Sequence, residues 1–434
     1  MDINITGFKK EIHKKIINLP GDKSIAHRSL IIGAISKGNY NIYNFPKSED
    51  CITTLEIMKR LGVEATYENN NVISIISPGI ESFKKDVGIL NCNNSGTAVR
   101  LLLGLLCGAN IKSTLIGDES LSKRPMKRVI EPLELMGGNI KSSEDKLPIE
   151  TTNTSVLKDM EYFMSVASAQ VKSALLIAAL VASKNIVIKE NLNTRDHTEI
   201  MMKYLGANIK VQGDIISLEK SILTSRDIYI PGDISSAAFL IGLCILSEKS
   251  SISIKEVLIN SRRSKFIDIL ISMGANIEVE NKLNKSGELV GDIRVTSSKL
   301  KAVEVLSYDT PNIIDEIPML SVLAAFSQGT TVIRAVDELK VKESNRLNGI
   351  INNLSLCGIR AWYEKGDLFI EGKSGYINKD VTIETEKDHR IAMAFAVLSI
   401  RNLKTTRIKH WQCTNISFPE NVKFFSKFLN IDYI

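Results

Sequence analysis

The sequence has few residues of the kinds that mark metal sites and disulfide frameworks. Its six cysteines are scattered over 434 residues, with no Cys-x-x-Cys pair and no histidine at ligand spacing, so zinc and disulfide sites both lack support. We therefore assign no metal ligand and expect thiols in a reducing compartment. The cysteines are Cys51, Cys92, Cys107, Cys244, Cys357 and Cys413, of which Cys92 and Cys413 are expected to be small core residues.

Long apolar segments are also missing. The longest runs, such as LLIAALVA at 175–182, are far shorter than the ~20 residues that a membrane-spanning helix needs. The first residues, MDINITGFKKEIHKKI, lack the apolar centre of a secretory signal. We therefore expect a soluble, cytoplasmic protein that has no membrane partner.

Positive charge is only slightly in excess. The 55 Lys and Arg residues exceed the 49 Asp and Glu residues by six, which is less than the concentrated basic charge of a nucleic-acid-binding protein. No GxxxxGK[ST] segment occurs and no glycine triplet follows a strand, which disfavours nucleoside triphosphatases and dinucleotide-binding proteins. The balance suits small acidic substrates, and we expect neither a nucleic-acid partner nor a cofactor.

One pattern recurs along the chain. In each copy an amphipathic helix ends at a glycine and an alternating strand follows. The glycines lie roughly 70–85 residues apart, which is long enough for a βαβαββ unit. The copies are LEIMKRLGVEA (55–65), LELMGGNIK (133–141), MMKYLGANIKV (201–211), ILISMGANIEV (269–279), NNLSLCGIRAW (352–362) and a shortened SKFLNIDYI (426–434).

A second symmetry divides the chain into two halves of three units each. The segment LPGDKSIAHRSLIIGA (19–34) has an echo in IPGDISSAAFLIGLCI (230–245), where Pro-Gly-Asp again precedes an apolar helix. We expect residues 1–18 to pair back onto the second half. One lobe would then comprise 1–18 and 231–434, and the other 19–230. A cleft between two lobes is a natural place for a ligand.

Cations gather at five predicted helix starts. A Lys or Arg at such a position costs about 0.3–1 kcal/mol unless an anion lies on it. Helix starts bind phosphate and carboxylate through backbone N–H groups, which cations reinforce. A single cation of this kind is more often solvated, but five together favour an anion site. The segments are LPGDKSIAHRSLIIGA (19–34), NNSGTAVRLLLGLL (93–106), SLSKRPMKRVIEPL (120–133, with Pro125 at the first helical position), LKVKESNRL (339–347) and EKDHRIAMAFAVL (386–398).

Two carboxylates are candidates for acid–base chemistry. Glu343 lies beside Lys342 and three residues before Arg346, so a surface pair with that arginine is an equally good explanation. Asp315 precedes an apolar helix that it could simply cap. Three histidines in polar segments serve equally well as structural donors, namely His27, His197 and His389.

Five short segments resemble the signatures of the 5-enolpyruvylshikimate-3-phosphate synthase family, in that family's order. They are PGDKSIAHR (20–28), NSGTAVR (94–100), KRP (123–125), VKESNRL (341–347) and DHRIAMA (388–394). The resemblance implies an α/β (α+β) fold, a two-domain inverse α/β barrel of six βαβαββ units, three per domain. It also implies transfer of the enolpyruvyl group of phosphoenolpyruvate to the 5-hydroxyl of 3-phosphoshikimate, with release of phosphate, in the shikimate pathway.

The same resemblance implies roles for individual residues. The residues for 3-phosphoshikimate are Lys23, Ser24, Arg28, Ser168, Ala169, Gln170, Thr194, Asp315 and Lys342. Those for phosphoenolpyruvate are Lys23, Asn94, Gly96, Arg124, Gln170, Arg346 and Arg390. Asp315 resembles the family's base and Glu343 its proton donor, with Lys342 and Lys23 in support. Both substrates are multiply anionic, so they would supply the counter-charges for these cations. Ile416 stands where the family often has a lysine.

Two other functions are compatible with parts of this pattern. The sister enolpyruvyl transferase that acts on UDP-N-acetylglucosamine has the same sixfold architecture, but typically carries Lys-Asn where this chain has Lys23-Ser24. A non-catalytic anion- or RNA-binding protein could use the same basic helix starts. The presence of Asp315, Lys342 and Glu343 together disfavours it, as does the lack of interleaved aromatic residues. We expect a monomer.

Overall fold

The chain forms two compact units in the computed structural model, which describes residues 1–8, 11–12, 15–68, 71–373 and 375–434. Unit 1 comprises Met1–Pro20, Gly232–Leu283 and Leu289–Ile434. Unit 2 comprises Gly21–Pro231 and Asn284–Glu288. The sequence places divisions at 18/19 and 230/231, whereas the units divide at 20/21 and 231/232. Nothing in the sequence indicates that Asn284–Glu288 packs with unit 2.

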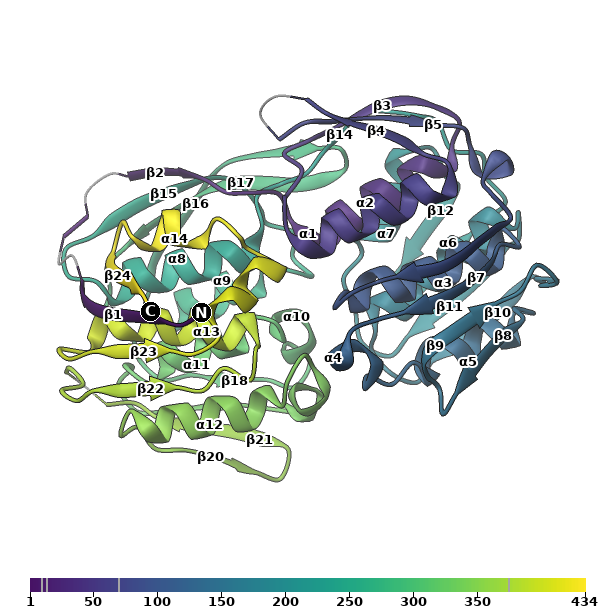
Figure 1. The fold of residues 1–434 in the computed structure, drawn as a ribbon. Coiled ribbons are helices and arrows are strands. Elements are labelled where there is room, and N and C mark those ends of the chain that lie inside the picture. The colour runs from purple at the N-terminus through teal and green to yellow at the C-terminus, as the bar shows by residue number, and fades with distance from the viewer. Residues whose placement is uncertain (9–10, 13–14, 69–70, 374) are drawn as a thin grey trace. The chain divides into compact units, whose positions relative to one another are not determined.

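All sheets share one plan. Among the described residues there are six four-stranded sheets, three in each unit (Figure 1). In each, one strand of a parallel pair is followed across the sheet by two more strands, of which the first is antiparallel to it. The sheet of β6 (Asp86–Asn91), β7 (Lys112–Ile116), β9 (Lys146–Thr151) and β8 (Ile140–Ser143) shows the order. In four of these sheets the parallel strands follow one another in the chain and helical segments join them, whereas β14 pairs with β3 and β2 with β15 across long stretches of sequence. The recurrence of the same strand arrangement in all six sheets confirms the predicted sixfold repeat and fold class.

In unit 2 two apolar helices, α3 (Gly96–Gly108) and α6 (Ala169–Val181), pack against each other and form the centre of the core (Figure 1). A Cβ at Gly104 would lie 2.2 Å from the carbonyl oxygen of Ala174, so only glycine permits this approach. The other main elements are α1 (Lys23–Ile31), β3 (Gly38–Tyr43), α2 (Glu49–Leu61), β4 (Glu64–Tyr67), β5 (Ile73–Ser77), α4 (Glu119–Ser122), α5 (Lys127–Leu135), β10 (Met160–Met164), β11 (Ile186–Glu190), α7 (His197–Tyr204), β12 (Ile209–Gln212), β13 (Ile215–Leu218) and β14 (Ile228–Tyr229).

In unit 1 three apolar helices, α8 (Ile234–Leu246), α11 (Ile317–Ala324) and α13 (His389–Leu398), fill the core, and every residue of α8 is buried. The other main elements are β1 (Ile3–Phe8), β2 (Lys15–Asn18), β15 (Ser251–Leu258), α9 (Lys265–Ser272), β16 (Asn276–Lys285), β17 (Glu288–Thr296), β18 (Glu304–Val305), α10 (Thr310–Ile313), β19 (Thr330–Ile333), α12 (Arg346–Leu356), β20 (Ala361–Glu364), β21 (Asp367–Glu371), β22 (Val381–Ile383), β23 (Thr406–Ile408), α14 (Asn421–Phe425) and β24 (Leu429–Tyr433).

The predicted helix-ending glycines are confirmed. Gly62, Gly137, Gly206, Gly274 and Gly358 have φ values of 114°, 107°, 101°, 93° and 74°. These values lie in the left-handed region that favours glycine, where a helix can end without a steric penalty. A strand begins within a few residues of each, as the sequence pattern predicts.

The chain enters and leaves unit 2 at its two Pro-Gly-Asp segments. Strand β2 pairs in parallel with β15 in unit 1, and β14 pairs in parallel with β3 in unit 2. Within unit 2, the N–H of Asp22 donates to the carbonyl of Pro231 at 2.8 Å. Within unit 1, the N–H of Asp233 donates to the carbonyl of Pro20 at 3.0 Å. Strand β1 lies between β23 and β24, and the two chain ends are neighbours in unit 1 (Figure 1).

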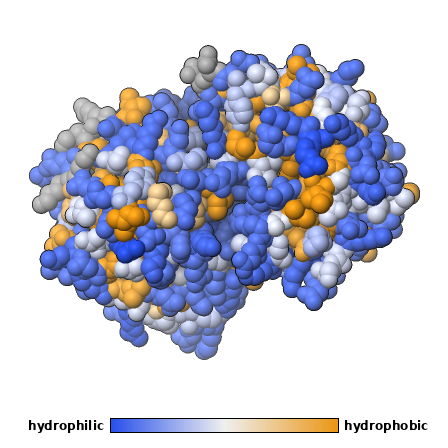
Figure 2. Space-filling model, viewed as in Figure 1, coloured by the Kyte–Doolittle hydropathy of each residue, from blue (hydrophilic) through white to orange (hydrophobic). Residues whose placement is uncertain are grey.

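The visible surface is mostly hydrophilic, with apolar side chains in scattered groups (Figure 2).

All six cysteines are buried thiols, including Cys92 and Cys413 as predicted. In the part of the chain that the structure describes, no helix is long and apolar enough to cross a membrane. The same described residues contain no cluster of three or more His, Cys, Asp or Glu side chains arranged to hold a metal ion.

Candidate active site

Lys23 is the first residue of α1 and lies immediately after the helix cap. The Asp22 carboxylate accepts a hydrogen bond from the N–H of Ile25 at 3.0 Å. Lys23 Nζ lies 2.8 Å from Asp50 Oδ2 in α2. This lysine therefore has an anionic partner within the protein, which corrects the expectation that substrates alone balance it. Ser24 follows in the first turn and is half-buried.

Arg28 is held by neutral oxygens. Its guanidinium donates to Ser24 O at 2.8 Å, Thr198 Oγ1 at 2.7 Å and Ser173 Oγ at 2.7 Å. Burial lowers the pKa of Arg28 to about 10, while the nearby Glu199 and Asp22 carboxylates oppose that shift. The side chain stays charged at neutral pH but is 2% exposed. Direct contact with a ligand would require it to exchange one of these hydrogen bonds.

The start of α3 brings two guanidinium groups beside Gly96. Arg124 Nη2 donates to Asn94 Oδ1 at 3.2 Å, and Arg100 Nη1 donates to Gln170 Oε1 at 2.9 Å. A Cβ at Gly96 would lie 2.9 Å from Arg100 Nη1 and 3.0 Å from Arg124 Nη1. The absence of a side chain thus lets both cations approach the helix start, which is an arrangement suited to an anion. Arg100 has no role implied by the family resemblance.

The basic cluster around Pro125 differs from its prediction. Helix α5 begins at Lys127, so Pro125 lies before the helix and not at its first position. Lys123 Nζ lies 2.6 Å from Glu119 Oε1, and Lys127 Nζ lies 3.3 Å from Glu131 Oε1. Both pairs are exposed, and exposed pairs contribute little to stability. These two lysines are surface charges with partners of their own.

Ser168, Ala169 and Thr194 lie at or before helix starts in unit 2. The Ser168 hydroxyl caps α6 by accepting from the N–H of Val171 at 3.4 Å, and Ala169 is the first residue of that helix. Thr194 lies in the loop between β11 and α7, where its N–H and Oγ1 donate to Glu190 Oε2 at 2.9 and 2.5 Å. Thr194 is buried, whereas Ser168 and Ala169 are half-buried.

In unit 1, Arg346 is surrounded by three carboxylates. Its guanidinium lies 2.5 Å from Glu343 Oε2, 2.8 Å from Asp388 Oδ2 and 3.4 Å from Asp315 Oδ1. Burial alone would lower the pKa of Arg346, but the three carboxylates outweigh it and raise the pKa. The Glu343–Arg346 pair that the spacing predicts is present, and because the arginine is 0% exposed it is not a surface pair.

Asp315 also faces a second arginine. Arg390 Nε lies 3.6 Å from Asp315 Oδ1, and Arg390 Nη1 donates to the Asp315 carbonyl at 2.9 Å and to Ser235 Oγ at 3.1 Å. Asp315 does not cap α11, because Glu316 occupies the cap position and makes no side-chain capping bond there. The capping alternative for Asp315 is therefore wrong, and this carboxylate bridges Arg346 and Arg390.

Lys342 completes the group in unit 1. Its Nζ lies 3.2 Å from Glu338 Oε1. Burial lowers the pKa of Lys342, and the Glu338, Asp315 and Glu343 carboxylates oppose that shift. Two carboxylates and a lysine with a lowered pKa are groups that can carry out general acid–base chemistry.

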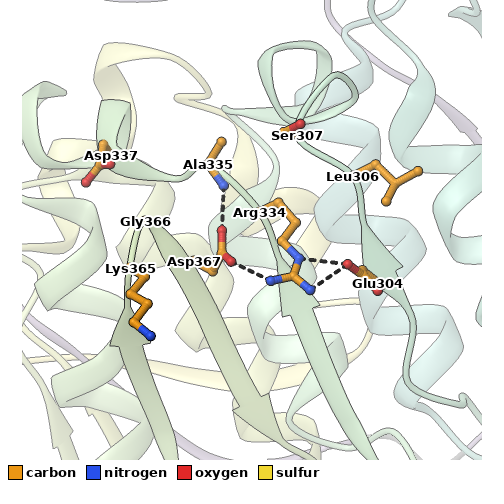
Figure 3. A pocket seen from close by; sticks show the side chains of 9 residues that line it. All are labelled: Glu304, Leu306, Ser307, Arg334, Ala335, Asp337, Lys365, Gly366 and Asp367. Carbon is orange, nitrogen blue, oxygen red and sulfur yellow. Dashed lines mark hydrogen bonds and ion pairs between the residues drawn. The ribbon is translucent and has the colours of Figure 1, made fainter.

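A separate hollow of about 490 Å³ lies in unit 1 beside β18, β19 and β21 (Figure 3). Its Arg334 side chain bridges Glu304 at 2.7 Å and Asp367 at 2.6 Å, and Asp367 also accepts from the N–H of Ala335 at 3.0 Å. None of the predicted site residues lines it. We therefore do not assign the chemistry to this hollow.

Several partners of the site residues have no sequence signal at local spacing. Glu316, for example, lies 3.6 Å from Arg390 through Oε1 and Nη1. Asp388, which belongs to the DHR segment, pairs with Arg346, and the spacing of the two residues does not predict this contact. Pairs separated by tens of residues leave no periodic pattern, so only the fold reveals them.

Solved structures define the class of protein to which this fold belongs. The enolpyruvyl transferase NikO from Streptomyces tendae has a TM-score of 0.78 at 16% identity, covering 100% of this chain and 98% of that chain, which shows a shared fold. EPSP synthase from Acinetobacter baumannii has a TM-score of 0.88 at 34% identity, covering 99% of both chains. The protein therefore has the enolpyruvyl transferase fold.

The family itself follows from sequence comparison. The model of EPSP synthase (3-phosphoshikimate 1-carboxyvinyltransferase) matches residues 9–425. The 3-phosphoshikimate 1-carboxyvinyltransferase of Clostridium tetani is 45% identical over 99% of this chain and 98% of that protein, and that of Caldicellulosiruptor bescii is 42% identical over 96% and 97%. The chain belongs to the EPSP synthase family, which confirms the predicted resemblance.

Proposed function

We propose that the protein transfers the enolpyruvyl group of phosphoenolpyruvate to the 5-hydroxyl of 3-phosphoshikimate and releases phosphate. Membership of the EPSP synthase family over nearly the whole chain supports this activity. The observation that carries the chemistry is the clustering of Asp315 and Glu343 on the buried Arg346 guanidinium. These two carboxylates can supply a proton acceptor and a proton donor at one site, as the reaction requires.

We infer the substrate contacts from the matching motif positions. 3-Phosphoshikimate is assigned to Lys23, Ser24, Arg28, Ser168, Ala169, Gln170, Thr194, Asp315 and Lys342. Phosphoenolpyruvate is assigned to Lys23, Asn94, Gly96, Arg124, Gln170, Arg346 and Arg390. Because these residues are divided between units 1 and 2, the proposal requires both units to contribute to substrate binding.

In the proposed reaction the 5-hydroxyl oxygen attacks C2 of phosphoenolpyruvate while Asp315 accepts the hydroxyl proton. Glu343 delivers a proton to the methylene carbon, which becomes a methyl group in a tetrahedral adduct. Loss of phosphate and of one methyl proton then forms the enolpyruvyl product. An anionic group of phosphoenolpyruvate that binds Arg346 would compete with the Glu343 ion pair and so favour the protonated acid that this step needs.

A phosphate-release assay tests the proposal. Purified protein is incubated with phosphoenolpyruvate alone, with added 3-phosphoshikimate, or with added UDP-N-acetylglucosamine. We expect release only with 3-phosphoshikimate. Release with UDP-N-acetylglucosamine alone would assign the protein to the sister activity, and no release with either acceptor would overturn the proposed reaction.

A further inference from the structure

The second Pro-Gly-Asp segment places Ser235 in the first turn of α8, at the position that Ser24 has in the first segment. Ser235 is 6% exposed, and the family resemblance implies no role for it. Its hydroxyl nevertheless meets three charged side chains in unit 1, those of Arg263, Glu316 and Arg390.

The Ser235 hydroxyl uses all of its hydrogen-bonding capacity. It donates to Glu316 Oε1 at 2.6 Å, and it accepts from Arg390 Nη1 at 3.1 Å and from Arg263 Nη2. A hydroxyl has one proton and two lone pairs, and a carboxylate accepts hydrogen bonds without donating any. The hydroxyl proton is therefore directed at Glu316, which leaves both lone pairs for the two arginines.

The Arg390 guanidinium is held on one side. Its Nη1 donates to Ser235 Oγ and, at 2.9 Å, to the Asp315 carbonyl, so both Nη1 protons are used. Its Nε lies 3.6 Å from Asp315 Oδ1, which is longer than a hydrogen bond. Its Nη2 has no hydrogen-bond partner among the residues that the structure describes. The edge formed by Nε and Nη2 therefore retains donors for the two parallel bonds by which a guanidinium holds a carboxylate or phosphate.

The charge of Arg390 has no carboxylate at hydrogen-bond distance in the described part of the chain. The nearest carboxylate oxygens, Asp315 Oδ1 and Glu316 Oε1, both lie 3.6 Å from its nitrogens. Glu316 pairs instead with Arg263, whose Nη1 lies 2.7 Å from Oε2. Arg346, by contrast, has carboxylate oxygens at 2.5 and 2.8 Å. Because Arg263 takes up the charge of Glu316, that of Arg390 stays available to an incoming anion.

Stability alone is a weak explanation for the buried Arg263–Glu316 pair. The two side chains are 2% and 0% exposed, and the loss of their hydration offsets most of what their attraction contributes. Apolar side chains of similar volume often stabilise a core as well or better. What the charged pair adds is direction, because it fixes where the Ser235 hydroxyl points.

We propose that Ser235 is a positioning residue that orients Arg390 toward an anionic group of phosphoenolpyruvate. Arg263 acts with it by holding Glu316, which would otherwise pair with Arg390. The inference rests on the proposed function, which assigns phosphoenolpyruvate to Arg390. Ser235 and the Asp315 carbonyl fix one edge of the guanidinium without using the donors of the other edge. Binding then requires no exchange of these bonds and less ordering of the side chain.

The first test compares Ser235→Ala with Ser321→Ala. Ser321 is a matched control, because it is also buried in unit 1 and its hydroxyl donates within its own helix, to the carbonyl of Ile317 at 2.8 Å. Neither substitution changes a charge. The measured quantities are kcat, the KM for phosphoenolpyruvate at saturating 3-phosphoshikimate, and the calorimetric Kd for 3-phosphoshikimate.

Loss of the bond to the Arg390 guanidinium predicts a rise of about tenfold in the KM for phosphoenolpyruvate in Ser235→Ala. We expect kcat to change by less than about twofold, because the contact serves the ground state and the transition state alike. The Kd for 3-phosphoshikimate should stay the same, since no partner of the Ser235 hydroxyl is assigned to that substrate. Ser321→Ala should leave all three quantities unchanged.

A double-mutant cycle shows whether Ser235 acts through Arg390. Arg390→Lys keeps the charge but has no second nitrogen to orient, so adding Ser235→Ala to it should raise the KM by less than Ser235→Ala does in the wild type. Additive effects, an unchanged KM in Ser235→Ala, or an equal loss of affinity for both substrates would overturn the proposal.

Arg263→Gln tests the part assigned to Arg263. It leaves Glu316 without its partner, so the carboxylate should pair with Arg390 and raise the KM for phosphoenolpyruvate by about tenfold or more. Adding Glu316→Gln removes the competing charge and should lower the KM again; a KM that does not fall would overturn this part. If Arg263→Gln fails to fold, Arg263→Lys replaces it, because one nitrogen cannot serve both Glu316 and Ser235 as the guanidinium does.

The wild-type assay separates this inference from the proposed function. Wild-type protein that releases no phosphate with 3-phosphoshikimate would overturn the proposed function and this inference with it. Active wild-type protein with an unchanged KM in Ser235→Ala would overturn this inference alone.

Discussion

The substitution Asp388→Asn should lower the free energy of unfolding of unit 1. The Asp388 carboxylate caps α13 by accepting from the N–H of Arg390 at 2.8 Å. It also accepts from Arg346 Nε at 2.8 Å and from the Ser344 hydroxyl at 3.2 Å. The Asp388 carboxylate thus connects Arg346, which faces Asp315, with the start of α13. That helix start carries Arg390, another arginine proposed to bind phosphoenolpyruvate.

The size of the effect follows from which contacts survive. Asparagine caps helices as well as aspartate does, so Asp388→Asn should retain the bond to the Arg390 N–H. The charge-assisted bond to Arg346 is lost, which predicts a decrease of about 1.5–3 kcal/mol in the free energy of unfolding. Asp388→Ala removes the cap as well and should cost about 1 kcal/mol more. Arg346 keeps two other carboxylates, so the unit should still fold.

Tryptophan fluorescence in urea gives a readout specific to unit 1. Both tryptophans of the sequence, Trp362 and Trp411, belong to this unit. Asp22→Asn is the matched control, because Asp22 also caps a helix but lies in unit 2, and it should leave the transition unchanged. If Asp388→Asn and Asp388→Ala both altered the unfolding free energy by less than about 0.5 kcal/mol, the argument for this carboxylate would be refuted.

Three further predictions concern single residues. Glu343→Gln should slow phosphate release at least about 100-fold without weakening calorimetric binding of 3-phosphoshikimate, and a parallel loss of binding would remove Glu343 from the role of proton donor. Because burial lowers the pKa of Lys342 below 10.5, kcat/KM should decline with rising pH from below that value, and Lys342→Arg should move the decline upward; coincident profiles would contradict this. Burial also lowers the pKa of His27 from 6.5 to about 3, so the unfolded chain binds a proton before the folded one and stability falls as the pH drops below 6.5. The slope approaches about 1.4 kcal/mol per pH unit. Hydrogen exchange of α1 amides should show this loss, and His27→Asn should reduce it.

The fold was largely predictable because its signals are local. A helix that ends in the left-handed region needs a residue with positive φ, which favours glycine. The glycine itself is therefore the sequence signal, as at Gly62 and Gly274. The same logic fails for Asn284–Glu288, which packs with unit 2. The flanking strands β16 and β17 have an ordinary hairpin pattern, and nothing in their alternation records which unit the tip contacts.

The positions of the positively charged site residues could be predicted from the sequence, whereas the carboxylates that pair with them could not. Lys23 and Arg346 stand out because a charge at the start of an apolar helix is unusual, but Asp50 and Asp388 lie 27 and 42 residues away from them. No periodic pattern connects residues at such separations. Ser235 did leave a signal, since it stands in the second Pro-Gly-Asp segment at the place of a serine in the first. This position could have been singled out from the sequence.

The paired Pro-Gly-Asp segments have a consequence for how the protein forms during synthesis. Apart from the short piece 284–288, unit 2 is one uninterrupted stretch, Gly21–Pro231. Its entry and exit are hydrogen-bonded neighbours, Asp22 and Pro231. That stretch has nearly all its native contacts once residue 231 has left the ribosome. Strand β1, made first, must wait for β23 and β24 near the other end of the chain. Unit 2 is thus inserted into the sequence of unit 1. The residues of β1 are synthesised first, yet they are among the last to gain their partner strands.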